Sequence, residues 1–515
     1  MEMSREMTNF GFVINHAVCI GCHACTVACK AENNVPLGAF RTWVKYIEKG
    51  RFPHTRRHFA VLRCNQCQDA PCITICPVTA LFQRDNGIVD FDGDRCIGCK
   101  ACMQACPYDA LYINPATNTA EKCHFCAHRV EVGLQPACEI VCPERAIISG
   151  DLDDPHSEIS RLVALENVQV RKAEQGTRPK VFYMEADETA LDPGATRLPS
   201  TYMWSAVRPD ANETLLQLST PELAEDVVRR VYDVDHPAPW GWKVSAYLWT
   251  KSVAAGSLLL AAIGLILGYG AEEHQFSIVA PLLALLFIGA TNGLLIADLK
   301  RPERFWRLLL RPNWRSWLVW GGYILTIFSL LALAWLVVGM AGDHPTLRVL
   351  VWPSALLAIL TAVYSAFLFG QAEGRDFWQS PLLLWHLLVA AALAGSAMLT
   401  LTGAFAGAST QPFVSGILLG SLLAHFLALM AELLVPHPNA DAAAAAHLIV
   451  WGRFRERFWG YTVGVGIALP LIILAPFGGS PPPAPLAIIA SLVAMYGLYV
   501  YEELWIKAGQ AIPLS

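Results

Sequence analysis

The sequence predicts two domains of different class: an N-terminal α+β domain and a C-terminal all-α membrane domain of about eight transmembrane helices. All sixteen cysteines lie between Cys19 and Cys142. Residues 1–240 hold 24 Lys+Arg and 31 Asp+Glu, whereas residues 241–515 hold only 14 and 12, mostly in short clusters between apolar runs. A chain of 515 residues is also too long for one ordinary domain. The net charge of −5, without a basic stripe, gives no indication of nucleic-acid binding.

The cysteines form four runs of four. In chain order the runs are Cys19, Cys22, Cys25, Cys29; Cys64, Cys67, Cys72, Cys76; Cys96, Cys99, Cys102, Cys106; and Cys123, Cys126, Cys138, Cys142. The first and third runs follow C-x2-C-x2-C-x3-C, and the second follows C-x2-C-x4-C-x3-C. The fourth run has a middle gap of eleven residues. Three cysteines at such short intervals surround one 4Fe–4S cluster, and the fourth ligates another cluster in two-cluster ferredoxins. Pro77, Pro107 and Pro143 complete the usual ending, whereas Lys30 departs from it.

Structural zinc and a disulfide framework are the alternatives. Zinc sites use two separated cysteine pairs, and a third cysteine three residues further on does not fit them. A disulfide framework is typical of small secreted chains, and the first eighteen residues show no signal peptide or twin-arginine pair. The spacing therefore predicts a ferredoxin-like domain with four 4Fe–4S clusters that carries electrons and has no substrate-converting centre of its own.

The N-terminal half resembles the four-cluster iron–sulfur subunit of molybdopterin oxidoreductases of the dimethyl sulfoxide and polysulfide reductase type. The segments ISGDLDDPHSEISRL at 148–162 and TRPKVFYME at 177–185 extend the resemblance beyond the cysteines. It implies that Cys19, Cys22, Cys25 and Cys142 hold one cluster and Cys29, Cys123, Cys126 and Cys138 another. It likewise implies a third cluster on Cys64, Cys67, Cys72 and Cys106, and a fourth on Cys76, Cys96, Cys99 and Cys102.

The predicted domain boundaries are an electron-transfer domain over 1–190, a linker over 191–240 and a membrane domain over 241–515. The linker is rich in Pro, acidic and small polar residues. Apolar stretches of spanning length then recur at 246–269, 277–297, 317–340, 349–370, 380–402, 412–434, 460–478 and 485–505. A soluble helical domain would need polar helix faces, which these stretches lack.

The distribution of basic residues predicts the orientation in a prokaryotic inner (plasma) membrane. The 298–316 connection carries six Lys and Arg, and the 437–459 and 371–379 connections add four more, whereas the alternate connections carry only Arg348. The positive-inside rule then places both termini and the iron–sulfur domain on the cytoplasmic side. The alternative is that these basic loops hold the acidic N-terminal domain, and that a partner with a twin-arginine signal carries the assembly across.

The C-terminal half resembles the polysulfide reductase/NrfD-type membrane anchor. The matching segments are AYLWTKSVAAGS at 246–257, IADLKRPERFWRLLLRPNWRSWLVWGG at 296–322, YSAFLFGQAEGRDFWQSP at 364–381 and YEELWIKAGQAIPLS at 501–515. The resemblance implies a haem-free quinone site near the iron–sulfur subunit, and a separate molybdopterin-containing catalytic subunit as partner. The protein is then a fusion of two subunits that are usually separate.

Ionisable residues inside apolar spans are candidates for function because burying them in a bilayer is costly. Lys251 lies five residues into the first predicted span, where it either contacts a quinone or extends to water at the membrane edge. Tyr364 occupies the position where the related anchors use a tyrosine to bind a quinone oxygen. The alternative for Tyr364 is an interfacial aromatic residue.

A second polar group comprises His386, His425 and Glu432. His386 is a further quinone-binding candidate, and His425 and Glu432, seven residues apart on one helix face, are proton-transfer candidates. Hydrogen bonds between helices are the more common role of such residues. Two histidines on adjacent spans also permit a b-type haem, but the resembling anchors lack haem.

These features predict an electron-transfer and membrane-anchor subunit of a quinone-linked molybdopterin oxidoreductase. It would pass electrons between a separate molybdenum subunit and the membrane quinone pool. A proton-translocating membrane module and a passive scaffold are the alternatives. The sequence specifies neither the terminal substrate nor the direction of electron flow.

Overall fold

The computed structural model describes residues 8–51, 53–195, 228–269, 273–406, 409–478 and 480–515. The protein divides into two units, one comprising Met1–Pro237 with Pro513–Ser515 and the other Ala238–Ile512. Most of the predicted linker, residues 196–227, lies outside the described residues. Its described end contributes strand β11 (Val228–Tyr232), which pairs antiparallel with β2 (Thr42–Arg51) in the N-terminal unit.

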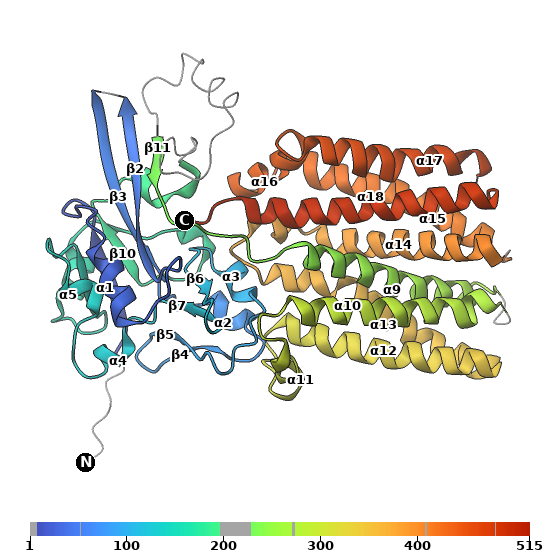
Figure 1. The fold of residues 1–515 in the computed structure, drawn as a ribbon, viewed down its shortest axis with the longest axis horizontal. Helices are drawn as coiled ribbons and strands as arrows, with labels where there is room; N and C mark the ends of the chain where they lie inside the picture. The colour runs from blue at the N-terminus through green and yellow to red at the C-terminus, as the bar shows by residue number, and fades with distance from the viewer. Residues whose placement is uncertain (1–7, 52, 196–227, 270–272, 407–408, 479) are drawn as a thin grey trace. The chain divides into compact units, whose positions relative to one another are not determined.

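The N-terminal unit is built on two sheets and two short hairpins (Figure 1). The first sheet has the order β8-β1-β10-β9, with bounds Ile147–Asp151, Phe10–Asn15, Val181–Met184 and Val168–Gln169; β1 is parallel to β10 and antiparallel to β8. The second has the order β11-β2-β3, with β3 at His54–Arg63. The hairpins are β4–β5 (Leu81–Gln83, Val89–Phe91) and β6–β7 (Leu111–Ile113, Ala120–Lys122).

Seven short helices complete the described part of this unit: α1 (Ala24–Glu32), α2 (Pro71–Ile75), α3 (Ala101–Ala105), α4 (Ala127–Val130), α5 (Ala137–Ile140), α6 (Glu158–Leu165) and α7 (Glu188–Leu191). Helix α1 packs against α5, and α2 packs against α3. Each of these four helices carries at least one cysteine. A core that includes Phe12, Val61, Phe125, Ile147 and Tyr183 holds the sheets beneath them. The predicted α+β class is confirmed.

Among the described residues, eight helical segments of the C-terminal unit are long and apolar enough to cross a membrane, as predicted. They are Trp242–Ile266 (α9), Gln275–Asp298 (η4 and α10), Trp317–Ala341 (α12), His344–Gly370 (α13), Leu383–Phe405 (within α14, Leu383–Ala406), Gln411–Leu434 (α15), Arg457–Phe477 (η7, α17 and η8) and Ala484–Ala511 (α18). Two shorter helices, α11 (Arg307–Leu310) and α16 (Ala440–Val450), lie in the connections. The largest boundary difference is at α18, which extends six residues beyond the predicted end at residue 505.

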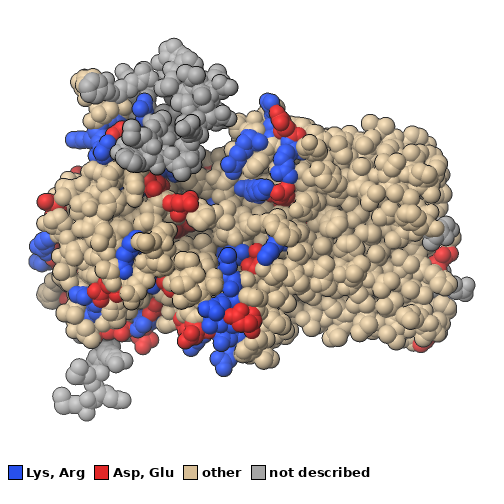
Figure 2. Space-filling model, viewed as in Figure 1, with Lys and Arg blue, Asp and Glu red and all other residues tan. Residues whose placement is uncertain are grey.

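Polar contacts join the connections between the membrane helices at one end of the unit. Gln371 accepts a hydrogen bond from the Trp317 amide (2.8 Å) and donates to the Arg315 carbonyl (2.6 Å). Arg375 donates to the Ile512 carbonyl (2.9 Å). In Figure 2 the charged side chains of this unit gather mainly at one end of the helices, over the connection that contains α11 and beside α16, while the visible face along the helices is largely uncharged. This distribution is typical of helices that face lipid and end in water.

Two pairs of glycines allow helices to approach at backbone distance. A Cβ atom added to Gly256 of α9 would overlap the Ala391 carbonyl of α14, and one added to Gly395 of α14 would overlap the Gly256 backbone. Gly466 in the seventh span and Gly497 of α18 meet in the same way. Small residues at such crossings supply the close packing on which helix association in lipid depends. These crossings therefore set the positions of α9, α14 and α18, which carry the buried polar groups described below.

Replacing Gly256 with leucine should destabilise the membrane unit. The added side chain has no room beside Ala391, and overpacking of this kind typically costs about 1–3 kcal/mol. Thermal unfolding in detergent should show a lower midpoint for Gly256→Leu. Gly289→Leu is the matched control, because a Cβ at Gly289 meets nothing within 4 Å. Equal midpoints for the two variants would contradict the close crossing.

Candidate functional site

The loops that carry the cysteine runs turn sharply before short helices. Gly21 and His23 (φ 68° and 61°) lie in the first run, and Gly98 and Lys100 (φ 69° and 64°) occupy the same places in the third. Left-handed conformations at these positions fold each C-x2-C segment back on itself. Backbone amides then approach sulfur atoms, as at Cys96, where the Gly98 amide lies 3.4 Å from Sγ.

The structure brings the sixteen cysteines together in four sets, defined by thiols close enough for electrostatic interaction. Each set combines three cysteines of one run with one cysteine of another. Set I contains Cys19, Cys22, Cys25 and Cys142, and set II contains Cys29, Cys123, Cys126 and Cys138. Set III contains Cys64, Cys67, Cys72 and Cys106, and set IV contains Cys76, Cys96, Cys99 and Cys102.

The thiols of a set surround a common space. The four cysteines of set I line one small cavity, and the four cysteines of set II line another. Zinc would bring its sulfur ligands to about 2.3 Å from one ion. Within the described residues, which include every cysteine, no three Cys, His, Asp or Glu side chains are close enough together to bind a single metal ion. Four thiols around one space are the donor set that a 4Fe–4S cluster uses.

Burial disfavours deprotonation of the cysteine thiols. Burial raises the pKa of Cys19 to about 11 and that of Cys99 to about 12. Since a cluster ligand must be a thiolate, iron has to supply the compensating positive charge. Backbone amides also stabilise the negative charge on sulfur. The amide of Ala80 lies 3.2 Å from the Cys76 sulfur, and the amide of Ala146 lies 3.2 Å from the Cys142 sulfur.

Arg63 lies between sets I and II. Its side chain is 0% exposed and donates from Nη1 to the Cys138 sulfur at 3.2 Å, while the guanidinium lies over the Phe12 ring at 4.5 Å. Burial disfavours its charge, but the thiolates of Cys138, Cys123 and Cys25 outweigh burial and raise its pKa. Arg63 is therefore a fixed positive charge shared by two sets.

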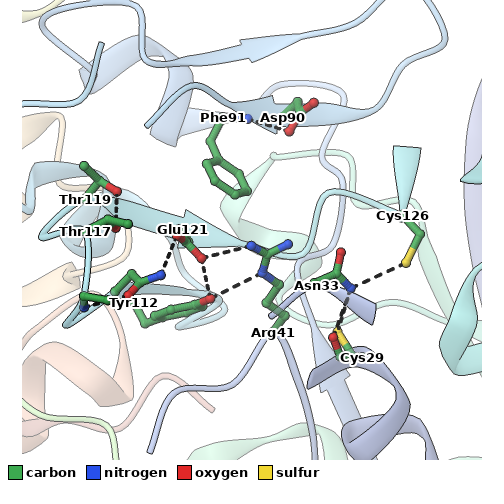
Figure 3. A network of polar contacts seen from close by, with 12 residues as sticks. Cys29, Asn33, Arg41, Asp90, Phe91, Tyr112, Thr117, Thr119, Glu121 and Cys126 are labelled. Carbon is green, nitrogen blue, oxygen red and sulfur yellow. Dashed lines mark hydrogen bonds and ion pairs between the residues drawn. The ribbon is translucent and has the colours of Figure 1, made fainter. Parts of the chain in front are cut away.

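A second network surrounds the other side of set II (Figure 3). The Asn33 amide lies 3.7 Å and 3.8 Å from the sulfur atoms of Cys29 and Cys126. Nearby, Arg41 pairs with Glu121 at 2.9 Å, and Glu121 also accepts hydrogen bonds from Tyr112 and Asn114, both at 2.7 Å. Because the buried carboxylate is fully paired, this network holds the β6–β7 hairpin rigidly.

The four sets form a line. Sets I and II share Arg63. Between sets II and III, Gln66 and Lys122 both donate to the Cys123 carbonyl (2.9 and 3.0 Å), and Lys122 also interacts electrostatically with Cys67 and Cys72. Sets III and IV come together where Cys102 interacts with Cys72. Cys22 of set I is the one exposed cysteine among the sixteen, so the line has an accessible end.

In the membrane unit, the structure brings Lys251 and Tyr364 together. Lys251 is 0% exposed; its Nζ lies 5.1 Å from the Tyr364 ring centre and donates to the Ala362 carbonyl and the Ser365 hydroxyl, both at 2.8 Å. Helix α9 begins at Trp242, so Lys251 lies about 13 Å along the helix. A side chain directed at α13 from that depth does not support the alternative that it extends to water.

His386, His425 and Glu432 also meet. His386 Nδ1 lies 2.8 Å from Glu432 Oε2, and the His386 and His425 rings lie edge to face at 5.2 Å. Tyr501 and Trp505 of α18 donate to Glu432 at 3.1 and 3.3 Å. Since the two histidine rings are packed against each other, no macrocycle fits between them, which argues against a haem on this pair.

The sequence reasoning missed Arg63, Tyr501, Trp505 and Glu502. Both carboxylate oxygens of Glu502 are buried and have no hydrogen-bond partner among the residues that the structure describes. The predicted last span, 485–505, contains Glu502, but the sequence reasoning gave this residue no role. The longer α18 places it nine residues from the helix end at Ala511. Buried ionisable residues in the final span are functional candidates for the same reason as those in the first.

Two known protein families match this sequence, one in each half of the polypeptide. Residues 231–513 match the family described as polysulphide reductase, NrfD, and residues 56–152 match the 4Fe-4S dicluster domain. The NrfD match covers more than half of the sequence.

Similar proteins are subunits of reductases. The sequence is 46% identical over 188 residues to a tetrathionate reductase subunit of Salmonella typhimurium, a match that covers 36% of this protein and 75% of that one. It is 38% identical over 176 residues to a polysulfide reductase subunit of Wolinella succinogenes, covering 34% and 92%. It is 35% identical over 226 residues to the arsenate respiratory reductase iron-sulfur subunit of a Shewanella species, covering 34% and 96%. The protein therefore belongs to the polysulphide reductase NrfD family, and it joins an NrfD membrane unit to a unit of the reductase iron–sulfur subunit family in one polypeptide.

Proposed function

We propose that this protein is the electron-transfer and membrane-anchor subunit of a quinone-linked oxidoreductase whose catalytic subunit is a separate, molybdopterin-containing polypeptide. The observation that carries the proposal is the line of four cysteine sets with one accessible end. Clusters bound to these thiols supply one-electron transfer. The protein's own residues hold the sets in order, shield them from water and place positive charge between them.

The accessible end is the proposed contact with the catalytic subunit. Around the exposed Cys22, apolar side chains are also exposed: Ile20 in the same loop, Val27 on α1, and Ile140 on α5, which packs against α1. Exposed apolar patches of this kind are typical of protein interfaces. The similarity to subunits of tetrathionate, polysulfide and arsenate reductases supports a catalytic partner that acts on a terminal substrate.

The membrane end is the proposed site of quinone chemistry. Lys251 and Tyr364 place an ammonium and a phenol side by side in an apolar unit, and both groups can donate to a quinone oxygen. His386 lies with the proton-transfer candidates His425 and Glu432 rather than with this pair. A prokaryotic inner membrane with the N-terminal unit on the cytoplasmic side is part of the proposal, supported by the basic connections at one end of the spans.

The cluster content is the first test. Four 4Fe–4S clusters correspond to about sixteen iron atoms per polypeptide, so iron analysis of anaerobically purified protein should approach that value. Cys138→Ser should lower the iron content by about one cluster, because Cys138 belongs to set II alone. Stoichiometric zinc, or full iron content in the variant, would contradict the assignment.

The charge of Arg63 should raise the reduction potential of the cluster in set II. A buried positive charge 3.2 Å from a ligand sulfur stabilises the reduced, more negative state. Redox titration followed by electron paramagnetic resonance should give a lower potential for one cluster in Arg63→Met. Arg63→Lys keeps the charge and should shift that potential less. An unchanged potential in Arg63→Met, at normal iron content, would refute this role.

The quinone site is tested on the full-length protein in nanodiscs. Wild-type clusters should be reduced by a soluble quinol, measured from their absorbance in a stopped-flow experiment. Lys251→Met and Tyr364→Phe should each slow the reduction about tenfold or more and weaken binding of a quinone analogue, because each removes a donor. Tyr323→Phe is the control, since the Tyr323 hydroxyl donates to the Leu309 carbonyl in another part of the unit. Normal rates in both site variants would remove the assignment.

A further inference from the structure

A small cavity with room for about one water molecule lies between α9, α14 and α18 in the membrane unit. It is lined by Leu248, Leu383, His386, Leu387, Tyr501, Glu502 and Trp505. Glu502 is 5% exposed, and neither of its carboxylate oxygens has a hydrogen-bond partner among the described residues. The neighbouring Glu503 differs: it pairs with both Arg457 and Lys507 at 2.5 Å.

An unpaired carboxyl at this depth is costly to keep. Leaving a buried polar group without a partner costs roughly 1–3 kcal/mol, and more when it is charged. Native structures therefore rarely contain one without a function, an ion or a water to satisfy it. The cavity beside the carboxyl has room for about one water molecule. The combination of an unpaired acid and an adjoining cavity indicates a group that exchanges protons.

Glu502 lies between the two polar groups already described. On one side, its charge interacts with the ammonium of Lys251, the quinone-binding candidate, and with Tyr247, which in turn interacts with Tyr364. On the other side it shares the cavity with His386, whose ring is hydrogen-bonded to Glu432 and stacked on Tyr501 with centres 5.0 Å apart. These contacts come chiefly from α9, α14 and α18, whose backbones meet their neighbours at the close glycine crossings.

We propose that Glu502 is the proton-exchanging residue that connects the quinone site at Lys251 and Tyr364 with the His386–Glu432 pair through the small cavity beside it. The proposal rests on the quinone site of the proposed function. When a quinol is oxidised there, it loses two electrons and two protons. The electrons pass one at a time to the iron–sulfur unit. Each proton passes in turn to the Glu502 carboxylate, on to the His386–Glu432 pair and from that pair to water, so that the pair is free to take the second proton. Quinone reduction uses the same groups in reverse.

The decisive variants are Glu502→Gln, which keeps the shape but cannot exchange a proton, and Glu503→Gln as the matched neighbouring control. Both are made in the full-length protein in nanodiscs. Quinol-driven cluster reduction should slow at least tenfold in Glu502→Gln, with a larger solvent isotope effect in D₂O, while binding of the quinone analogue changes less than twofold. Glu503→Gln should keep the wild-type rate, and Glu502→Asp should recover part of it.

An infrared difference spectrum gives a readout independent of rate. Reduction of the wild-type protein with quinol should produce a carbonyl band from a protonated carboxylic acid. The band should be absent in Glu502→Gln and present in Glu503→Gln. Thermal unfolding midpoints near the wild-type value in both variants would show that each has folded.

Each other result overturns the proposal in a recognisable way. A wild-type rate in Glu502→Gln shows that this carboxyl carries no proton needed for turnover. Loss of analogue binding in Glu502→Gln shows instead that the cavity holds the quinone itself. If the wild-type protein neither binds the analogue nor accepts electrons from quinol, the result contradicts the quinone site of the proposed function, and with it the role of Glu502.

Discussion

The architecture of the N-terminal unit depends on one geometric constraint: a short cysteine run supplies three ligands to one cluster, and its fourth cysteine reaches another. In α1, Cys25 and Cys29 are four residues apart, roughly 6 Å along the helix axis. Cys25 belongs to set I and Cys29 to set II. Residues far apart in the sequence, such as Cys19 and Cys142, are therefore tied together, and the sets necessarily lie next to one another.

This constraint concentrates negative charge in a buried region, and buried cationic side chains compensate that charge. Arg63 and Lys122 are both fully buried, and each is placed where two sets meet. Their positions compensate the sulfur charges and separate them at the same time. A loss of either cation would leave buried thiolates without a counter-charge, so we expect both to matter for assembly as well as for electron transfer.

In the membrane unit, too, buried ionisable groups are compensated by partners within the protein. Lipid cannot satisfy polar groups, so Lys251, His386 and Glu432 each find partners on another helix. Glycine crossings bring those helices close enough for the contacts to form. Among the described residues, neither the carboxylate oxygens of Glu502 nor the ring nitrogens of His425 have a hydrogen-bond partner, and only Glu502 of the two lines the cavity. Joining both units in one polypeptide also fixes their ratio at one to one and raises the effective concentration of each for the other.

Much of this organisation followed from local patterns. Cysteine spacing indicated the cofactor, and the length of the apolar runs indicated eight spans, because both depend on chain geometry over a few residues. The pairing of the cysteines entered through family resemblance rather than through spacing. The strand formed by Val228–Tyr232 had no comparable signal, since its partner β2 is far away in the sequence.

The sequence by itself determined the class of each unit, the candidate cofactor and the ionisable residues that enter the membrane. Only the tertiary structure decided which of those residues meet. The Lys251 side chain is directed at α13, His386 contacts Glu432 rather than Lys251, and Glu502 lines a buried cavity. The physical reason is that a side chain's environment in a helical membrane unit is set by neighbouring helices, and neither their crossings nor the true helix ends are encoded in hydropathy.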